Sequence, residues 1–166
     1  MSTLTPDSPF PESVTFTYVA PTGSLDINVC GMPIKYDASK EFQTKKVVLV
    51  AVPGAFTPTC QEQHIKSYLA NLDKLRAKGV DSVIFIAFND AWVMSAWGKA
   101  NGIKDDSILF MSDAGAEFSR SIGWTAGERT GRYALVIDHG KVTYAEADTK
   151  GGSIENSGAE GVLAKL

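Results

Sequence analysis

The stretch from residue 47 to residue 78 constrains the fold most strongly, because a strand, a turn and a long helix follow one another in it. Residues 47–52 (VVLVAV) form a β-branched apolar run typical of a buried strand, and Pro53 and Gly54 predict a turn. Thr57 suits the N-cap of a helix and Pro58 suits its first position. The following apolar residues recur at helical spacing, at Ile65, Tyr68, Leu69, Leu72 and Leu75. A strand that leads into an amphipathic helix indicates an α/β fold.

Cys60 falls in the first turn of this predicted helix. The unpaired NH groups and the positive dipole end of a helix start stabilise a thiolate, which is the nucleophilic form of cysteine. Cys60 is therefore a candidate catalytic residue. Taken on its own, a lone cysteine at a helix start is more often structural, because isolated cysteines are commonly buried in a core.

Strand and helix patterns alternate along the rest of the chain. An N-terminal β-hairpin is predicted from a strand at 14–19, a turn at 21–23 and a return strand at 25–29, followed by a helical turn at 37–40. Further strands are predicted at 82–88, 108–111, 132–137 and 142–147, with helices at 90–101, 114–122 and 159–166 and a surface loop at 150–158. These patterns predict one domain, residues 1–166, with a central mixed sheet covered by helices on both faces.

Composition excludes several classes of function. A chain of 166 residues with 44% hydrophobic and 21% charged residues is typical of one ordinary globular domain. The net charge is only −3 and no basic block occurs, so we expect no nucleic-acid partner, and two histidines leave little material for a metal site. No apolar run of transmembrane length and no signal sequence is present, so we expect an intracellular protein. Thiols are kept reduced there, which favours a redox role for the two cysteines.

Residues 53–60 (PGAFTPTC) resemble the motif of the peroxiredoxins, in which a proline, three residues, a threonine or serine and two residues precede the peroxide-reacting cysteine. The surrounding VPGAFTPTCQEQH, the later AWVMSAWGKANG, the pair Ser112-Asp113 and the segment RYALVIDHGKV are similar to the type 5 branch of that family, including its fungal members. The resemblance covers nearly the whole chain. It implies a thioredoxin-like fold and a thiol peroxidase that reduces hydrogen peroxide and alkyl hydroperoxides at Cys60 without a cofactor or a metal.

The chemistry requires more than an ionised thiol, because ionisation alone supplies too small a rate increase, so the site must also stabilise charge as the O–O bond breaks. Thr57 offers a hydroxyl donor and Arg132 a permanent cation with several donors. The resemblance gives these two residues the same roles and favours Arg132 over Arg129, because Arg132 begins the family's Arg-aromatic-apolar pattern. Pro53 is expected to shield the thiolate, and backbone NH groups near Gly54 and Cys60 could also take part.

Two further residues are candidates for the substrate pocket. His64 follows Cys60 by four residues and lies on the same helical face, so we expect a neutral histidine at the pocket rim that either assists the site or only packs there. Phe56 is expected to line the pocket entrance or to form a dimer contact.

The resemblance also suggests how Cys60 is recycled. Fungal members of the branch carry a resolving cysteine near the position of Cys30, which would form a disulfide with Cys60 across a homodimer; thioredoxin or glutathione would then reduce that disulfide. Cys30 could instead be an inert strand cysteine. Two other functions stay open, a thioredoxin-type disulfide oxidoreductase, in which Thr57 would have to be a cysteine, and a non-enzymatic chaperone or binding protein.

The last three residues, Ala164-Lys165-Leu166, are similar to the peroxisomal signal Ser-Lys-Leu. They predict a peroxisomal protein, with the cytoplasm as a second compartment. The alternative is a helix that happens to end in Lys-Leu.

Overall fold

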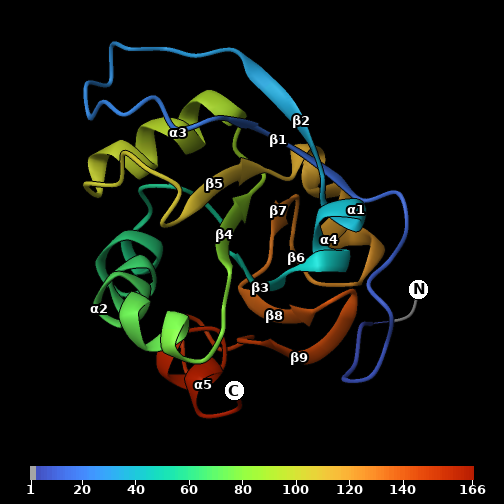
Figure 1. Ribbon diagram of the computed structural model, residues 1–166. Helices are drawn as coiled ribbons and strands as arrows, with labels where there is room; N and C mark the ends of the chain where they lie inside the picture. The colour runs from blue at the N-terminus through green and yellow to red at the C-terminus, as the bar shows by residue number, and fades with distance from the viewer. Residues whose placement is uncertain (1–2) are drawn as a thin grey trace.

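A seven-stranded mixed sheet forms the centre of the protein, whose computed structural model describes residues 3–166. Its strands are β1 (Thr15–Val19), β2 (Pro33–Asp37), β3 (Lys46–Ala51), β4 (Ser82–Ala87), β5 (Leu109–Ser112), β8 (Tyr133–Asp138) and β9 (Lys141–Ala147). They lie in the order β2-β1-β5-β4-β3-β8-β9 (Figure 1). β3, β4 and β5 run parallel, whereas the outer pairs, including β8 with β9, are antiparallel. The predicted mixed sheet is therefore confirmed.

The central strands are buried on both faces, which is why the sequence there is continuously apolar rather than alternating. In β3, Val48 and Val50 point into the core on one side of the sheet. Val47, Leu49 and Ala51 point into a second core on the other side.

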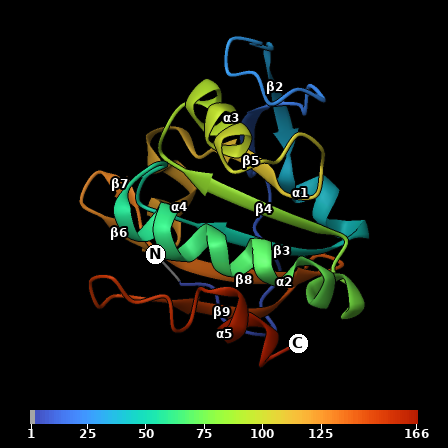
Figure 2. The ribbon, with the colours of Figure 1, turned by 90° about the vertical axis from the view of Figure 1, so that its left-hand side faces the viewer.

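Helices cover both faces of the sheet, as predicted. The helices α2 (Ile65–Ala77), α3 (Ala91–Ala100) and α5 (Ala159–Leu163) pack on the face with Val48, and α1 (Ala38–Glu41) and α4 (Glu117–Ser121) pack on the other (Figures 1 and 2). Asp90 caps α3 by accepting from the NH of Val93 at 2.9 Å. None of the helices within residues 3–166 has the length and apolar character needed to cross a membrane.

The single helix predicted at 114–122 is in fact two short pieces. A 3₁₀ turn, Ala114–Ala116, precedes α4, and Ala116 adopts a left-handed conformation with φ of 53° between them. The buried carboxylate of Asp113 accepts from the NH groups of Phe118 and Ser119, at 2.9 and 3.0 Å, and so begins a new helix after the kink.

The predicted N-terminal hairpin exists, but the prediction of its return strand at residues 25–29 is wrong. β1 pairs with β2, not with residues 25–29, which belong to a long loop, residues 20–32. In that loop Ser24, Asp26 and Asn28 donate their backbone NH groups to the side chains of Thr22, Ser24 and Asp26. Such local side-chain bonds compete with a strand ladder, and they leave the alternating apolar residues of the loop exposed.

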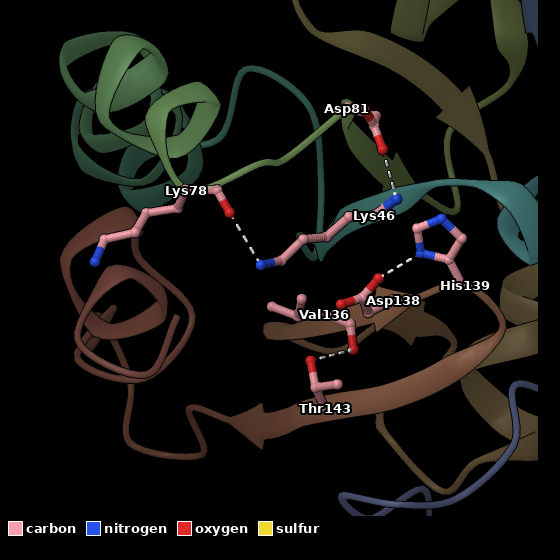
Figure 3. A network of polar contacts seen from close by, with 7 residues as sticks. All are labelled: Lys46, Lys78, Asp81, Val136, Asp138, His139 and Thr143. Carbon is pink, nitrogen blue, oxygen red and sulfur yellow. Dashed lines mark hydrogen bonds and ion pairs between the residues drawn. The ribbon is translucent and has the colours of Figure 1, made fainter.

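Polar contacts hold the end of the sheet at which β3 begins (Figure 3). The backbone NH of Lys46 donates to the carboxylate of Asp81 at 2.8 Å, and the Lys46 ammonium donates to the carbonyl of Lys78 at 3.0 Å. These contacts join the start of β3 to the connection between α2 and β4. They fix the parallel β3–β4 pair at the end opposite to the turn at residues 52–57, which follows β3.

Candidate active site

Cys60 lies where the chain leaves β3 and enters α2. The segment Cys60–His64 is π-helical, and the NH of Ile65 donates to the carbonyl of Cys60. π-Helical turns are rare and are frequently found at functional sites. Cys60 exposes no surface to solvent, so its sulfur is enclosed by the residues around the helix start.

Arg132 contacts the sulfur of Cys60. Its Nη2 lies 3.2 Å from Sγ and its Nη1 lies 2.9 Å from Nδ1 of His64. The structure thus places Arg132, and not Arg129, against the thiol. A permanently charged guanidinium at this distance can stabilise negative charge that develops next to the sulfur.

His64 is fully buried rather than at the pocket rim, which corrects the expectation from the sequence. The guanidinium of Arg132 can only donate, so Nδ1 of His64 is the acceptor and its proton must be on Nε2. Nε2 donates to the carbonyl of Ser157 at 2.9 Å. Burial lowers the pKa of His64 to about 4, with the charge of Arg132 acting in the same direction, so this histidine is neutral at neutral pH.

The residues that hold His64 could not be identified from the sequence. The carbonyl of Ser157 also accepts from the Tyr68 hydroxyl at 2.7 Å. Asp148 accepts from the backbone NH of Ser157 at 2.8 Å and from its hydroxyl at 2.6 Å, and the NH of Asp148 donates to the carbonyl of Arg132 at 2.9 Å. Ser157, which lies in the loop predicted at 150–158, therefore holds His64, and His64 holds the guanidinium of Arg132.

The turn between β3 and the helix brings together the other predicted residues. The Thr57 hydroxyl donates to the carbonyl of Gly54 at 2.6 Å, so in this structure it closes the turn instead of capping the helix or donating to Sγ. Phe56 is left-handed, with φ of 64°, and half of its side chain is exposed beside the half-buried Pro53. A left-handed phenylalanine is strained, and strained positions of this kind gather at functional loops.

A small hairpin that the sequence did not predict borders the same turn. It consists of β6 (Thr125–Ala126) and β7 (Arg129–Thr130). The Thr130 hydroxyl donates to the carbonyl of Val52 at 2.5 Å, which ties β7 to the active-site loop. Strands of two residues carry too little pattern to be recognised from a sequence.

Cys30 lies in the exposed loop at residues 20–32 rather than at the end of a strand. The indole NH of Trp92 donates to the carbonyl of Gly31 at 3.0 Å, and the buried ammonium of Lys99 donates to the carbonyls of Asp26 and Val29. Cys30 and Cys60 are both free thiols. Within residues 3–166, no three histidine, cysteine or acidic side chains gather as a metal-binding group.

This geometry combines a buried thiol, a guanidinium in contact with it and a neutral histidine that orients the guanidinium. Such an arrangement can form a sulfur nucleophile and stabilise an oxygen anion that leaves.

Comparison with known proteins gives the family. Residues 6–163 match the Redoxin family. All 166 residues align with peroxiredoxin AHP1 of Chaetomium thermophilum at 60% identity, over 96% of that protein. A putative peroxisomal peroxiredoxin of Lipomyces kononenkoae is 47% identical, over 95% of this chain and 98% of the relative.

Solved structures agree with this assignment. Reduced Prx3 of Vibrio vulnificus in complex with hydrogen peroxide has a TM-score of 0.81 and 38% identity, over 97% of this chain and 94% of that one. The expected thioredoxin-like peroxiredoxin fold is thereby confirmed. The chain belongs to the Redoxin family and is a peroxiredoxin, a thiol-dependent peroxidase of the oxidoreductase class.

Proposed function

We propose that the protein reduces hydrogen peroxide and small alkyl hydroperoxides at Sγ of Cys60. The observation that carries the proposal is the contact of 3.2 Å between Nη2 of Arg132 and that sulfur. The Vibrio relative, which was solved with hydrogen peroxide bound, supports this choice of substrate.

In the proposed reaction the Cys60 thiolate attacks one peroxide oxygen. An S–O bond forms, the O–O bond breaks, and the leaving oxygen takes a proton to become water or an alcohol. Cys60 is oxidised to a sulfenic acid, and the peroxide is reduced by two electrons.

Arg132 contributes both before the thiolate attacks and while the O–O bond breaks. Before attack its Nη2 donates to the sulfur, and as the O–O bond breaks its several donors stabilise the charge on the oxygens. The neutral His64 keeps the guanidinium in place by accepting from Nη1. Thr57, once its hydroxyl turns away from the Gly54 carbonyl, would be a further donor to the peroxide, and Pro53 would exclude water from the thiolate.

Cys30 is proposed to resolve the sulfenic acid. Its thiol attacks the Cys60 sulfur, a disulfide forms and water leaves, after which thioredoxin or glutathione reduces the disulfide. Cys30 is exposed on a surface loop, as a residue that must reach a partner requires, and it is the only other cysteine in the sequence. We place this bond between the two subunits of a homodimer, because a two-fold axis makes the exchange reciprocal.

We also propose a peroxisomal location, with the cytoplasm as a second compartment. It rests on the tripeptide Ala164-Lys165-Leu166 and on the Lipomyces relative, which is named as peroxisomal. Ala164 and Lys165 are exposed after the end of α5, whereas Leu166 packs partly on the core. A receptor would therefore have to lift Leu166 from the core. A fusion with a fluorescent reporter at the N-terminus should appear in peroxisomes, and diffuse fluorescence would contradict the proposal.

The test of the peroxidase proposal is steady-state peroxide consumption with thioredoxin or with glutathione as the electron donor. Cys60→Ser should fall below about a hundredth of the wild-type rate, because a serine hydroxyl does not supply an anion near neutral pH. Retention of more than a few per cent would exclude Cys60 from this role. Disulfide exchange without peroxide consumption would instead indicate the disulfide oxidoreductase, and neither activity would indicate a binding protein.

A further inference from the structure

A second arginine, Arg129, lies at the rim of the active-site turn and takes no part in the proposed chemistry. Its Nη1 is 2.9 Å from the point that a Cβ on Gly54 would occupy. Its guanidinium also lies over the ring of Phe88, 4.9 Å from the ring centre. Because Thr130 ties β7 to Val52, the backbone of Arg129 is held beside the active-site turn.

The charge of Arg129 is not neutralised by the protein. Within residues 3–166 the guanidinium forms neither an ion pair nor a side-chain hydrogen bond, and it lies over the face of Phe88. Arg132 differs, since both of its terminal nitrogens are engaged by Cys60 and His64. Arg129 is exposed, and its planar fork of donors matches the geometry of a carboxylate.

A carboxylate bound to Arg129 would lie near the start of the helix that carries Cys60. The Thr57 methyl carbon lies 3.1 Å from the same point beside Gly54, so Thr57 and Arg129 flank this glycine. The guanidinium therefore lies close to Thr57, which precedes Cys60 by about one helical turn. The half-exposed ring of Phe56 lies on the same turn and offers an apolar surface to the carbon skeleton of a hydroperoxide.

We propose that Arg129 binds the carboxylate of hydroperoxides derived from carboxylic acids, and so determines specificity at the Cys60 site. This inference rests on the proposed peroxidase function. The carboxylate would form a charge-assisted pair with the guanidinium while the peroxide group reaches Cys60. Because of this pair, the protein should favour anionic over neutral hydroperoxides of the same shape. Arg129 itself takes no part in the chemical step.

The experiment compares two substrates that differ in one charge. Cumene hydroperoxide that carries a carboxylate at the para position is the anionic substrate, and its methyl ester is the neutral one. The measured quantity is the ratio of their second-order rate constants with Cys60, acid over ester, determined by stopped flow. This ratio cancels any change that affects both substrates equally.

We expect Arg129→Gln to lower the ratio by about threefold to tenfold, the range for one partly solvated charge-assisted pair. Arg129→Lys should retain part of the preference, since it keeps the charge without the fork. Arg76→Gln is the matched control, because it removes one charge from an exposed arginine at the end of α2 far from Cys60 and should leave the ratio unchanged. The wild-type preference should also weaken with added salt, as contacts between exposed charges do.

The outcomes separate this inference from the proposed function. Wild-type protein that consumes neither hydrogen peroxide nor these substrates would overturn the proposed function itself. Normal consumption of hydrogen peroxide with an acid-to-ester ratio that is the same in wild type, Arg129→Gln and Arg76→Gln would overturn the role of Arg129 alone.

Discussion

At the scale of single residues, the protonation state of His64 and the position of Arg132 depend on each other. Nδ1 of His64 can accept from Arg132 only while the ring is neutral. A protonated ring would place two cations face to face inside the core. Burial and the arginine charge both oppose that protonation, which is why the pKa of His64 lies at about 4.

We expect Arg132→Lys to lower the second-order rate constant for hydrogen peroxide by about 100-fold, in the range for loss of one oxyanion donor. A lysine keeps the charge but lacks the planar fork whose two separate nitrogens contact Sγ of Cys60 and Nδ1 of His64. Stopped-flow kinetics give the rate constant, and circular dichroism checks the fold. Arg129→Lys is the matched comparison, and a larger loss in that variant than in Arg132→Lys would show that the wrong arginine has been assigned.

The pKa of His64 also predicts how stability depends on pH. In the unfolded chain the pKa is near 6.5, and in the folded protein it is about 4, so between these values only the unfolded state binds the proton. The free energy of unfolding should therefore fall as the pH drops from about 6.5 to 4, by on the order of 3 kcal/mol. Urea unfolding at several pH values measures this slope.

His64→Gln should flatten the slope in that pH window. A glutamine can accept from Arg132 and donate to Ser157, but it does not titrate. His139→Gln is the control, since His139 is exposed and pairs with Asp138. An unchanged slope in His64→Gln would mean that other groups cause the acid sensitivity.

At the scale of secondary structure elements, α3 clamps the π-helical turn that carries the thiol. Nε2 of Gln61 donates to the Asn101 side chain at 2.8 Å, and Oε1 of Gln61 accepts from Trp97 at 2.7 Å and from Asn101 at 3.1 Å. Cys60 is fully buried, and a disulfide needs its Cα within about 7 Å of its partner. The clamp must therefore loosen before a second thiol can reach Cys60.

Gln61→Ala should destabilise the protein by about 1–3 kcal/mol, because it leaves the buried indole NH of Trp97 without its acceptor. In a Cys30→Ser background, Gln61→Ala should also speed alkylation of Cys60 by a maleimide. The rate should rise about tenfold for each 1.4 kcal/mol by which the substitution lowers the free energy of opening the turn. Gln63→Ala is the matched control, since Gln63 is exposed on the same turn. Equal alkylation rates in the two variants would show that the amide cluster does not restrain the turn.

Some secondary structure elements could be predicted from the sequence and others could not. The strand at Lys46–Ala51 and the helix start at Asp90 were predictable, because a buried strand and an Asp cap are both local patterns. The hairpin partner of β1 was not, because the apolar alternation at residues 25–29 is overridden by side-chain turns. In the candidate site the motif identified Cys60, but the buried position of His64 depends on its bond to Ser157, which is 93 residues away in the chain and is held in turn by Asp148.

At the scale of the whole molecule, the two cysteines lie in opposite environments. Cys60 is buried beneath the helix start, whereas Cys30 is exposed on a loop that Lys99 and Trp92 hold against α3. The apolar side chains beside Cys30 are also exposed, with Met32 at 80% and Ile27 at 65%. Contiguous exposed apolar residues mark sites of protein association, so this loop is where we expect the homodimer contact that brings Cys30 to Cys60.

Peroxide-treated protein should therefore run as a disulfide-linked dimer on a non-reducing gel, and added thiol should convert it to monomer. Cys30→Ser should prevent the dimer while preserving the first turnover of peroxide, because only the resolving step needs Cys30. A monomeric band that contains an intact bond between Cys30 and Cys60 would place the disulfide within one chain. Normal recycling of Cys30→Ser with thioredoxin would show that Cys30 is not the resolving residue.

The most direct test of the account is to locate the first oxidation product. Cys30→Ser protein treated with one equivalent of hydrogen peroxide in the presence of a sulfenic-acid trap should carry the trap on the peptide that contains Cys60, in nearly every molecule. The same peptide from an Arg132→Lys double variant should react far more slowly, because the cation that contacts the sulfur at 3.2 Å is displaced. A Cys60 that remains an unmodified thiol while peroxide disappears would contradict the assignment of Cys60 as the residue that reacts with peroxide.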